Sequence, residues 1–170
     1  MEIILCNESH LKELTDFYNK IVLYLEKTTN YPLWIYGSYP AEQTIKTAID
    51  QKTQYAFIQN NKIVGAFVFN DDPRGKYENA KIEFKRGEYL IVHTLATDYE
   101  IYRQGIGSKM VKFCIEKAKK EGYKALYADI VPTNIPSRNL FKKCGFSYLG
   151  DFDLERDLDI PLFSLYELKL

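Results

Sequence analysis

Two apolar segments, residues 89–97 and 125–131, constrain the fold of this chain more than any other feature. Each segment is rich in apolar side chains on both alternating faces, which predicts strands that are covered on both sides. Between them, residues 105–121 carry apolar side chains at helical spacing, and Gly122 ends that pattern. A strand–helix–strand crossover makes its two strands parallel. The sequence therefore predicts an α/β fold built around one parallel pair.

The flanking segments add antiparallel strands and further helices. Asn60-Asn61 is a tight-turn pair between two apolar runs and predicts a hairpin. Asn7 or Ser9 is expected to cap a first helix, and Asn134 with Pro136 to start the last one. The predicted architecture is a single domain over residues 1–170, with a mixed, mostly antiparallel sheet of about seven strands and helices on both faces. The predicted strands are residues 3–6, 54–59, 62–69, 89–97, 125–131, 146–153 and 162–168, and residues 41–50 form a short second helix.

Composition excludes several classes of protein. The chain has 170 residues, 46% of them hydrophobic, which suits one domain with a substantial core. Lysine plus arginine and aspartate plus glutamate each number 23, so no basic excess indicates a nucleic-acid partner. Three widely spaced cysteines and two histidines favour neither a zinc site nor a disulfide framework, and no apolar run approaches the roughly 20 residues of a membrane span. We expect a cytoplasmic protein, a monomer or homodimer, with no metal, nucleic-acid or membrane partner.

The segment IYRQGIGSKM, residues 101–110, joins the first apolar strand to its helix. The first amides of a helix have no internal partner, and the helix dipole adds positive charge, so a helix start can hold an anion. Gly105 and Gly107 allow a ligand to approach closely, and Arg103 adds charge, which favours a diphosphate. A dinucleotide-binding fingerprint is excluded because Met110 occupies its third glycine position. The alternative is a glycine turn that only allows the helix to pack.

Two longer segments, VHTLATDYEIYRQGIGSKM and DIVPTNIPSRNLFKKCGF, resemble the GNAT family of acetyltransferases. The resemblance covers essentially the whole chain in element order and is specific at the glycine turn and in the second segment. It implies an acetyl-CoA co-substrate bound between two central strands that splay apart. The positions matching the family's acetyl-CoA contacts are Leu95, Ala96 and Thr97 along the pantetheine arm, Arg103, Gln104, Gly105, Ile106, Gly107 and Ser108 around the pyrophosphate, Asn134, and Lys143 near a CoA phosphate.

The sequence departs from the family pattern at two positions. The Gln or Arg expected three residues before the first glycine is Tyr102, which leaves a backbone cradle intact. Many members also carry a Tyr that protonates the leaving thiolate, and Phe141 stands at that position. A Cys-like thiol leaves as thiolate at pH 7 for about 2 kcal/mol, whereas deprotonating a lysine-like amine costs about 4.6 kcal/mol. Turnover without this acid is therefore feasible, and Tyr127 and Tyr148 are candidate substitutes.

His93 is the candidate general base. It lies on the strand that would face the thioester, and related enzymes place a Glu or His at positions matching 91 or 93; residue 91 is Ile here. A neutral imidazole can take a proton from an ammonium group directly or through water. The alternative is a buried histidine bonded to a neighbouring backbone group. Glu88 and Asp129 are back-up bases, although either fits an ordinary charge at a strand end.

An aromatic loop at residues 28–40 is the candidate wall of an acceptor pocket. In the GNAT family the acceptor lies between this loop and the loop of the last hairpin, residues 154–161 here. Tyr31, Trp34 and Tyr36 are the predicted contacts, and a local aromatic core is the alternative. The last loop would attract a cationic amine, or it is a solvated charged loop. Its acidic residues are Glu155, Asp157 and Asp159.

Together these features predict an acetyl-CoA-dependent N-acetyltransferase. It would move the acetyl group to a primary amine of a small molecule by direct attack in a ternary complex, with a backbone N–H near Leu95 or Ala96 stabilising the oxyanion. Three alternatives stay open. They are a transferase for a protein N-terminus or lysine, a non-catalytic acyl-CoA-binding sensor, which Phe141 favours, and a structural domain whose glycine turn binds nothing.

Overall fold

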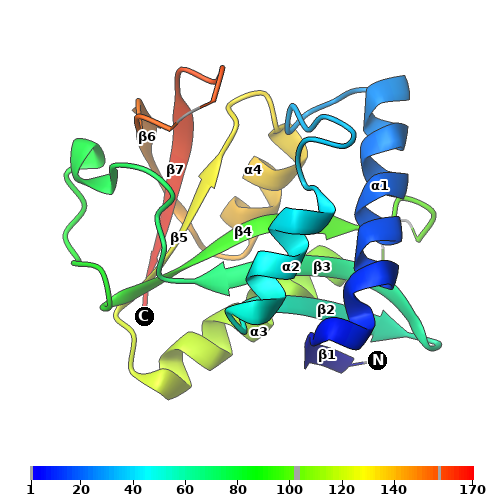
Figure 1. The fold of residues 1–170 in the computed structure, drawn as a ribbon. Helices are drawn as coiled ribbons and strands as arrows, with labels where there is room; N and C mark the ends of the chain where they lie inside the picture. The colour runs from blue at the N-terminus through cyan, green and yellow to red at the C-terminus, as the bar shows by residue number, and fades with distance from the viewer. Residues whose placement is uncertain (1, 102–103, 157) are drawn as a thin grey trace. The chain divides into compact units, whose positions relative to one another are not determined.

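The computed structural model describes residues 2–101, 104–156 and 158–170. Helices and strands follow each other in the predicted order (Figure 1). The helices are α1 (Leu11–Lys27), α2 (Glu42–Asp50), α3 (Ile106–Glu121) and α4 (Ile135–Lys143), with the 3-10 turns η1 (Glu8–His10) and η2 (Tyr77–Ala80). The strands are β1 (Glu2–Leu5), β2 (Gln54–Gln59), β3 (Lys62–Asn70), β4 (Tyr89–Thr97), β5 (Ala125–Ile130), β6 (Ser147–Phe152) and β7 (Phe163–Lys169).

The strands form a seven-stranded sheet in the order β1-β2-β3-β4-β5-β7-β6. As the crossover predicts, β4 and β5 are parallel, whereas β1–β2, β2–β3, β5–β7 and β6–β7 are antiparallel. The parallel register runs from Tyr89↔Ala125 to Ile91↔Tyr127, and β5 continues beside β7 as far as Ile130↔Ser164. The predicted fold class, a mixed and mostly antiparallel α/β sheet, is confirmed.

Short polar signals fix the ends of several elements. Asn7 caps η1 by accepting a hydrogen bond from the Ser9 amide at 3.0 Å. Asn60 and Asn61 take φ angles of 51° and 57°, which are the left-handed conformations that a tight hairpin turn requires. Gly122, with φ 81°, follows α3 in the conformation that ends a helix. The hairpin turn and the end of α3 are as predicted. Asn7, which was expected to cap the first helix, caps η1 instead, and α1 begins after His10, whose side chain makes no hydrogen bond that caps α1.

Close packing groups the residues into two compact units. The first holds Met1–Phe69 and Thr94–Met110, and the second holds Asn70–His93 and Val111–Leu170. β4 therefore contributes its first half to the second unit and its last four residues, 94–97, to the first.

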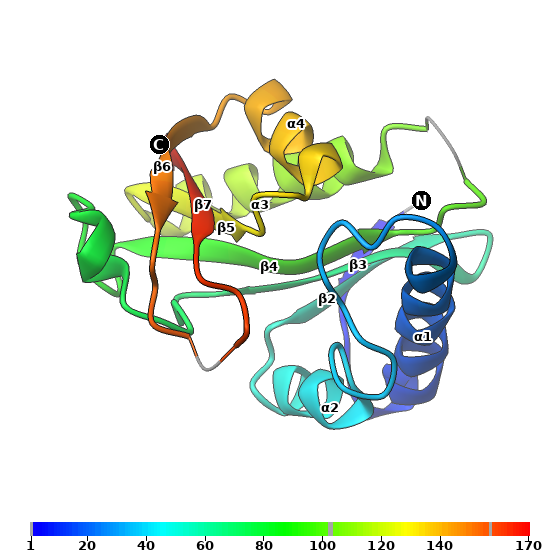
Figure 2. The same ribbon diagram turned by 90° about the horizontal axis from the view of Figure 1, so that it is seen from above.

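In the first unit, helices cover both faces of the strands. α1 and α2 pack on one face, where Leu14, Tyr18 and Ala66 belong to a single apolar core (Figure 2). Gly65, the neighbour of Ala66 on β3, faces the opposite side of the sheet, because successive residues of a strand alternate between its two faces. A Cβ at Gly65 would lie 2.8 Å from Met110 Sδ, so the start of α3 packs directly on this face.

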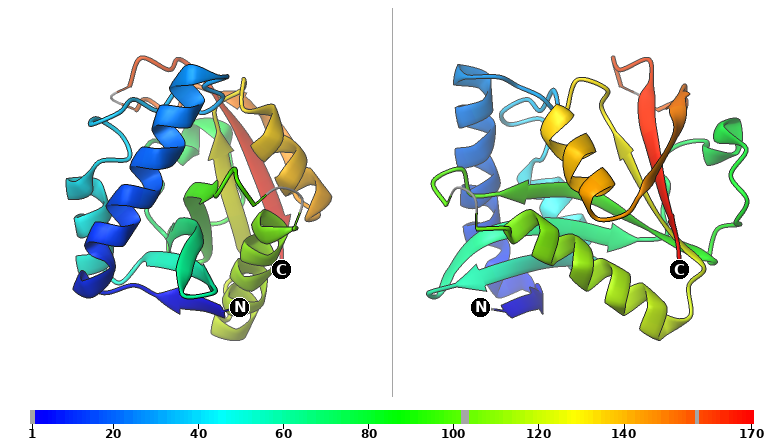
Figure 3. Two further views of the ribbon diagram at one scale, coloured as in Figure 1. Left: turned by 90° about the vertical axis from the view of Figure 1, so that its right-hand side faces the viewer. Right: turned by 180° about the vertical axis from the view of Figure 1, so that it is seen from behind.

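In the second unit, three tyrosines form the centre of the core. The rings of Tyr77, Tyr89 and Tyr127 lie with their centroids 5.0 to 6.1 Å apart. Tyr77 comes from η2, in a charged segment without an apolar period, so no sequence pattern marks it as a core residue. Leu154 belongs to the same core, and α4 packs against β5 (Figure 3).

The core of the first unit gives a stability prediction with a control on the same helix. Leu14 is 0% exposed, so Leu14→Ala is expected to lower the free energy of unfolding by about 2 to 5 kcal/mol. Leu23, also on α1, is 38% exposed, and Leu23→Ala should cost less than about 1 kcal/mol. Urea unfolding of both variants measures the difference, and equal losses would contradict the packing of α1 described above.

Candidate active site

The glycine turn leads into a helix start whose first amides have no partner within the helix. Gly105 has φ 70°, a left-handed conformation, and its carbonyl accepts the first helical hydrogen bond, from the Lys109 amide at 3.0 Å. The amides of Ile106, Gly107 and Ser108 therefore have no partner within α3. This arrangement can hold an anion through backbone N–H groups and the helix dipole.

Two more residues of the turn were predicted to help. Gln104 is exposed, and its Oε1 lies 3.4 Å from Gln59 Nε2, at the limit of a hydrogen bond. Arg103, predicted to add charge near a pyrophosphate, lies outside the described residues, as does the family-pattern position Tyr102. The described part of the turn thus supplies backbone donors and one amide side chain.

The end of β4 supplies the second predicted binding element. Ala96 is buried in the core of the first unit, whereas Leu95 and Thr97 are only half-buried. Alternation along the strand places these two side chains on the face opposite Ala96. At the start of this segment Thr94 has φ 51°, so the backbone leaves regular strand geometry immediately before the predicted pantetheine contacts.

Asn134 and Lys143 lie at opposite ends of α4 in the second unit. Asn134 caps the helix, with Oδ1 accepting from the Ser137 amide at 3.2 Å, so a ligand contact would come from its side-chain NH₂ group. Lys143 is exposed and is the last residue of the helix. Both predicted contacts are thus placed by the helix ends.

Phe141 has a packing role in the same helix. It is 3% exposed and meets Phe146 edge to face, with ring centroids 5.0 Å apart. Of the two candidate substitutes for the missing acid, Tyr127 is fully buried and donates a 2.6 Å hydrogen bond to Glu167. Burial and this bond raise the pKa of Tyr127. Tyr148 is 43% exposed and lies under the Arg138 guanidinium, which makes it the accessible candidate.

His93 is buried, and its position defines its tautomer. Its Nε2 lies 2.9 Å from the carbonyl oxygen of Asp72, and a carbonyl only accepts hydrogen bonds, so Nε2 carries the proton. The neutral ring then keeps its lone pair on Nδ1, which is 3.9 Å from Asp129 Oδ2. This hydrogen bond agrees with the alternative interpretation, a buried histidine bonded to a backbone group. The lone pair on Nδ1 could nevertheless accept a proton, so His93 stays a candidate base.

The pKa of His93 is lowered well below its ordinary value. Burial is the largest cause, and the positive charges of Arg74 and Arg156 act in the same direction. The hydrogen bond to Asp72 opposes them. His93 is therefore neutral at pH 7, which is the state in which it can accept a proton.

Asp129, a back-up base in the sequence analysis, lies in a buried charge cluster. Its side chain is 3% exposed, and Oδ1 pairs with Arg156 Nη2 at 2.7 Å. The hydroxyl of Tyr77 donates to Oδ2 at 2.6 Å. Burial raises the pKa of Asp129, and Arg156 and Tyr77 oppose that rise. Asp129 is thus the buried partner of three residues, the third being His93.

Arg156 is the residue that the sequence analysis missed. It comes from the loop that was described only by its acidic residues, yet its side chain is 11% exposed. Its guanidinium also donates to the Pro73 carbonyl at 3.0 Å and lies 4.5 Å from the centroid of the Phe163 ring. No local pattern marks Arg156, because both its ion-pair partner and the Pro73 carbonyl are distant in sequence.

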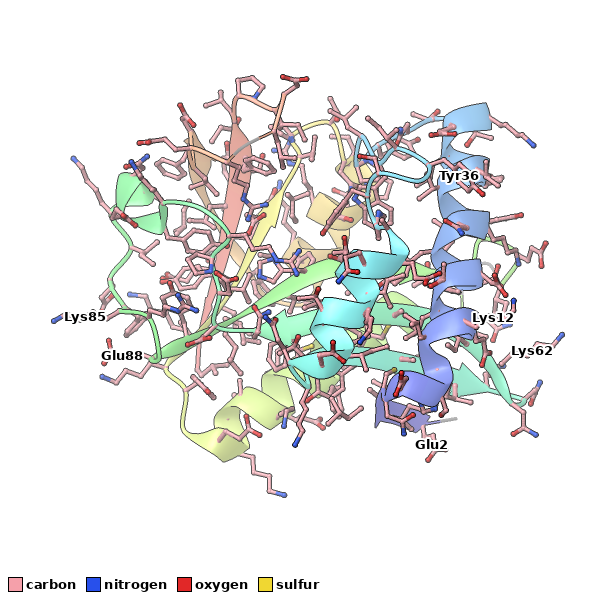
Figure 4. All side chains as sticks on the ribbon, viewed as in Figure 1. Glu2, Lys12, Tyr36, Lys62, Lys85 and Glu88 are labelled. Carbon is pink, nitrogen blue, oxygen red and sulfur yellow. The ribbon has the colours of Figure 1, made fainter. Side chains whose placement is uncertain are left out.

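The other charged candidates are engaged at the surface. Glu88, which is labelled in Figure 4, pairs with Lys124 at 2.5 Å, and this bond lowers the pKa of Glu88. Glu155 pairs with Lys76 at 2.5 Å and accepts a hydrogen bond from Asn79. Asp159 is exposed, and Asp157 lies outside the described residues. Glu155 therefore ties its loop to η2.

The aromatic loop after α1 divides into packed and exposed residues. The half-buried ring of Trp34 meets Tyr18 and Tyr39 edge to face, at 6.1 and 6.2 Å between centroids. Tyr31 is 36% and Tyr36 is 52% exposed, and Tyr36 projects from the loop (Figure 4). Trp34 therefore extends the core, as the local-core alternative expects, whereas Tyr31 and Tyr36 are exposed, and their contact with an acceptor stays a prediction.

The described residues form neither a metal site nor a membrane span. None of their His, Cys, Asp and Glu side chains gather in a group of three able to hold a metal ion. None of their helices has the length and apolar character of a membrane span.

Comparison with known proteins identifies the family. Residues 15–146 match the model of the Acetyltransferase (GNAT) family. A GNAT acetyltransferase from Streptococcus agalactiae has a TM-score of 0.81 at 17% identity, over 99% of this chain and 95% of that one.

Two further solved structures share the fold. A ribosomal-protein-alanine N-acetyltransferase from Brucella melitensis has a TM-score of 0.72 at 17% identity, over 100% of both chains. A Drosophila melanogaster polyamine N-acetyltransferase has a TM-score of 0.68 at 15% identity, over 99% of both chains. The family match covers most of the chain and agrees with the strand order and the glycine turn. This protein belongs to the GNAT family of acetyltransferases.

Proposed function

We propose that this chain is an acetyl-CoA-dependent N-acetyltransferase that acetylates a primary amine of a small molecule by direct attack in a ternary complex. The observation that carries the proposal is the start of α3, where the amides of Ile106, Gly107 and Ser108 have no helical partner behind a left-handed Gly105. GNAT proteins use acetyl-CoA, and a diphosphate fits this set of donors.

The family resemblance assigns each part of acetyl-CoA to particular residues of this chain. The backbone from Gln104 to Ser108 would bind the pyrophosphate, with Arg103 adding charge, and the backbone of residues 95–97 would pair with the pantetheine arm. Asn134 would donate its NH₂ group, and Lys143 would meet a phosphate. When bound, acetyl-CoA supplies the acetyl group as an activated thioester. The Leu95 or Ala96 N–H would donate to the thioester oxygen as negative charge develops there.

His93 is the proposed general base. Its Nδ1 holds a lone pair at neutral pH because Nε2 donates to Asp72 and the pKa is low. When Nδ1 takes up the proton of the ammonium group, directly or through water, the Asp129 carboxylate 3.9 Å away would stabilise the imidazolium. The low pKa limits how strongly His93 can pull this proton, so the amine must reach the site partly deprotonated.

Tyr31, Trp34 and Tyr36 are the proposed acceptor contacts. The exposed rings of Tyr31 and Tyr36 would cover the carbon chain of an amine, and Trp34 would hold the loop in place. Solved structures that share this fold include an agmatine and a polyamine N-acetyltransferase as well as a ribosomal-protein-alanine N-acetyltransferase, so both acceptor classes occur on it. The small-amine proposal therefore rests on the exposed rings of Tyr31 and Tyr36.

Binding of acetyl-CoA should stabilise the folded chain. At about 100 times its dissociation constant it should add about 2.7 kcal/mol, a rise in Tm of about 5 to 10 °C. Gly107→Asp places an acidic side chain at the helix start, where the dipole favours it, but there it repels a diphosphate. This variant should fold and lose the rise. Gln43→Asp, in the first turn of α2, is the matched control and should keep it. A rise that survives in Gly107→Asp would argue against pyrophosphate binding at this turn.

Turnover tests the acceptor class and the base together. CoA release is expected with agmatine or a polyamine and not with a peptide that begins with alanine, and the reverse result would favour the protein-acceptor alternative.

His93→Gln should lower kcat/KM by about 10²- to 10⁴-fold, the usual contribution of a general base. Full activity of this variant would remove His93 from the mechanism. Binding of acetyl-CoA without release of CoA for any amine would favour the sensor.

The low pKa of His93 also predicts how stability depends on pH. In the unfolded chain His93 takes up a proton near pH 6.5, whereas in the folded chain it stays neutral to lower pH. The free energy of unfolding should therefore fall as pH drops, by about 1.4 kcal/mol per unit below about pH 6.5. Urea unfolding at several pH values measures this slope. His93→Gln should flatten it by that amount, and an unchanged slope would show that His93 titrates normally in the folded protein.

A further inference from the structure

Thr94 has a backbone conformation that its side chain disfavours. It lies within the nine-residue strand β4, yet its φ is 51°. A β-branched residue is a genuine outlier in this region, because its Cβ substituents crowd the backbone. Such a conformation persists only where surrounding contacts enforce it, and it is often found at functional sites.

Two tyrosine hydroxyls hold Thr94. Tyr18, on α1, donates a hydrogen bond to the Thr94 carbonyl oxygen at 2.9 Å. Tyr39, at the end of the aromatic loop, has its hydroxyl 2.6 Å from Thr94 Oγ1. One tyrosine thus fixes the backbone and the other fixes the side chain of the same residue.

The two tyrosines are themselves held by the aromatic loop. The Trp34 ring lies between them, meeting both edge to face. Asn30 fixes the backbone of Trp34 on both sides, accepting from its amide at 3.1 Å and donating to its carbonyl at 2.6 Å. The Tyr39 amide then closes the end of the loop by donating to the Ile35 carbonyl at 2.9 Å. This connected set reaches from the proposed acceptor contacts to β4.

The bond from Tyr18 also fixes the direction of the next amide. The carbonyl of Thr94 and the N–H of Leu95 belong to one planar trans peptide unit, so they point in opposite directions and turn together. Holding the carbonyl with the Tyr18 hydroxyl therefore aims the Leu95 N–H away from α1. This N–H is one of the two donors proposed for the thioester oxygen.

We propose that Tyr18 and Tyr39 are positioning residues for acetyl transfer, which hold the Thr94–Leu95 peptide so that the Leu95 N–H faces the thioester oxygen. This inference rests on the transferase function proposed above.

The test separates orientation of the donor from binding. Tyr39→Phe and Tyr18→Phe should each lower kcat about tenfold or more, since a misdirected oxyanion donor loses part of the 10²- to 10³-fold that such a donor contributes. KM for acetyl-CoA should stay within about twofold. Tyr24→Phe is the matched control on α1: it keeps the ring stacked on Tyr99 at 3.9 Å and should keep wild-type kcat.

Variants at Thr94 test the contact itself. Thr94→Val keeps the shape and removes the hydroxyl, so it should lower kcat like Tyr39→Phe, and Thr94→Ser should restore it. The double variant Tyr39→Phe with Thr94→Val should be no slower than the slower single variant, because both remove one contact.

Each outcome of these measurements is decisive. If the wild type turns over and Tyr39→Phe keeps full kcat, raises KM alone, or adds its effect to that of Thr94→Val, the positioning role is overturned. If the wild type itself releases no CoA with any amine, the proposed function fails first, and the inference falls with it. A loss of kcat that Thr94→Ser avoids and that Tyr24→Phe does not show would establish the role.

Discussion

The parallel pairing of β4 with β5 is the constraint on which the path of β4 depends. Its register runs for only three residue pairs, from Tyr89↔Ala125 to Ile91↔Tyr127, although both strands continue. β4 then passes from one compact unit to the other between His93 and Thr94. At that step the backbone takes the left-handed φ of Thr94. The residues proposed for base and oxyanion donor, His93 and Leu95, lie on either side of this step along one strand.

The buried cluster around Asp129 explains how His93 keeps one tautomer. Burying an ion pair costs desolvation energy, so the pair of Asp129 with Arg156 is weak evidence for added stability by itself. It has a geometric consequence, however. Arg156 donates to the carbonyl of Pro73, and His93 Nε2 donates to the carbonyl of Asp72. Two successive carbonyls of one turn are therefore satisfied by the cluster, and the turn in return fixes which nitrogen of His93 carries the proton.

The sequence predicted the features that local physics determines. The apolar periods placed every strand and α-helix to within a few residues, and Asn134 was correctly placed at the start of α4. It did not predict the features that arise from distant contacts. The burial of Arg156 depends on Asp129, and the left-handed φ of Thr94 is held by Tyr18 and Tyr39, all remote in sequence. The predicted acetyl-CoA contacts could be named because they lie within local motifs. The surroundings of His93 could not, because they come from distant parts of the chain.

The packing of Phe141 bears on whether such a site can turn over. The family's acid position is filled by a ring that packs on Phe146, so this chain uses it for the core. A Cys-like thiolate needs only about 2 kcal/mol of help at pH 7, whereas an amine of ordinary pKa needs about 4.6 kcal/mol to lose its proton. The two groups proposed here act on separate steps: the neutral His93 would take the proton of the amine, and the backbone donor held by two hydroxyls would stabilise the charge that develops on the thioester oxygen.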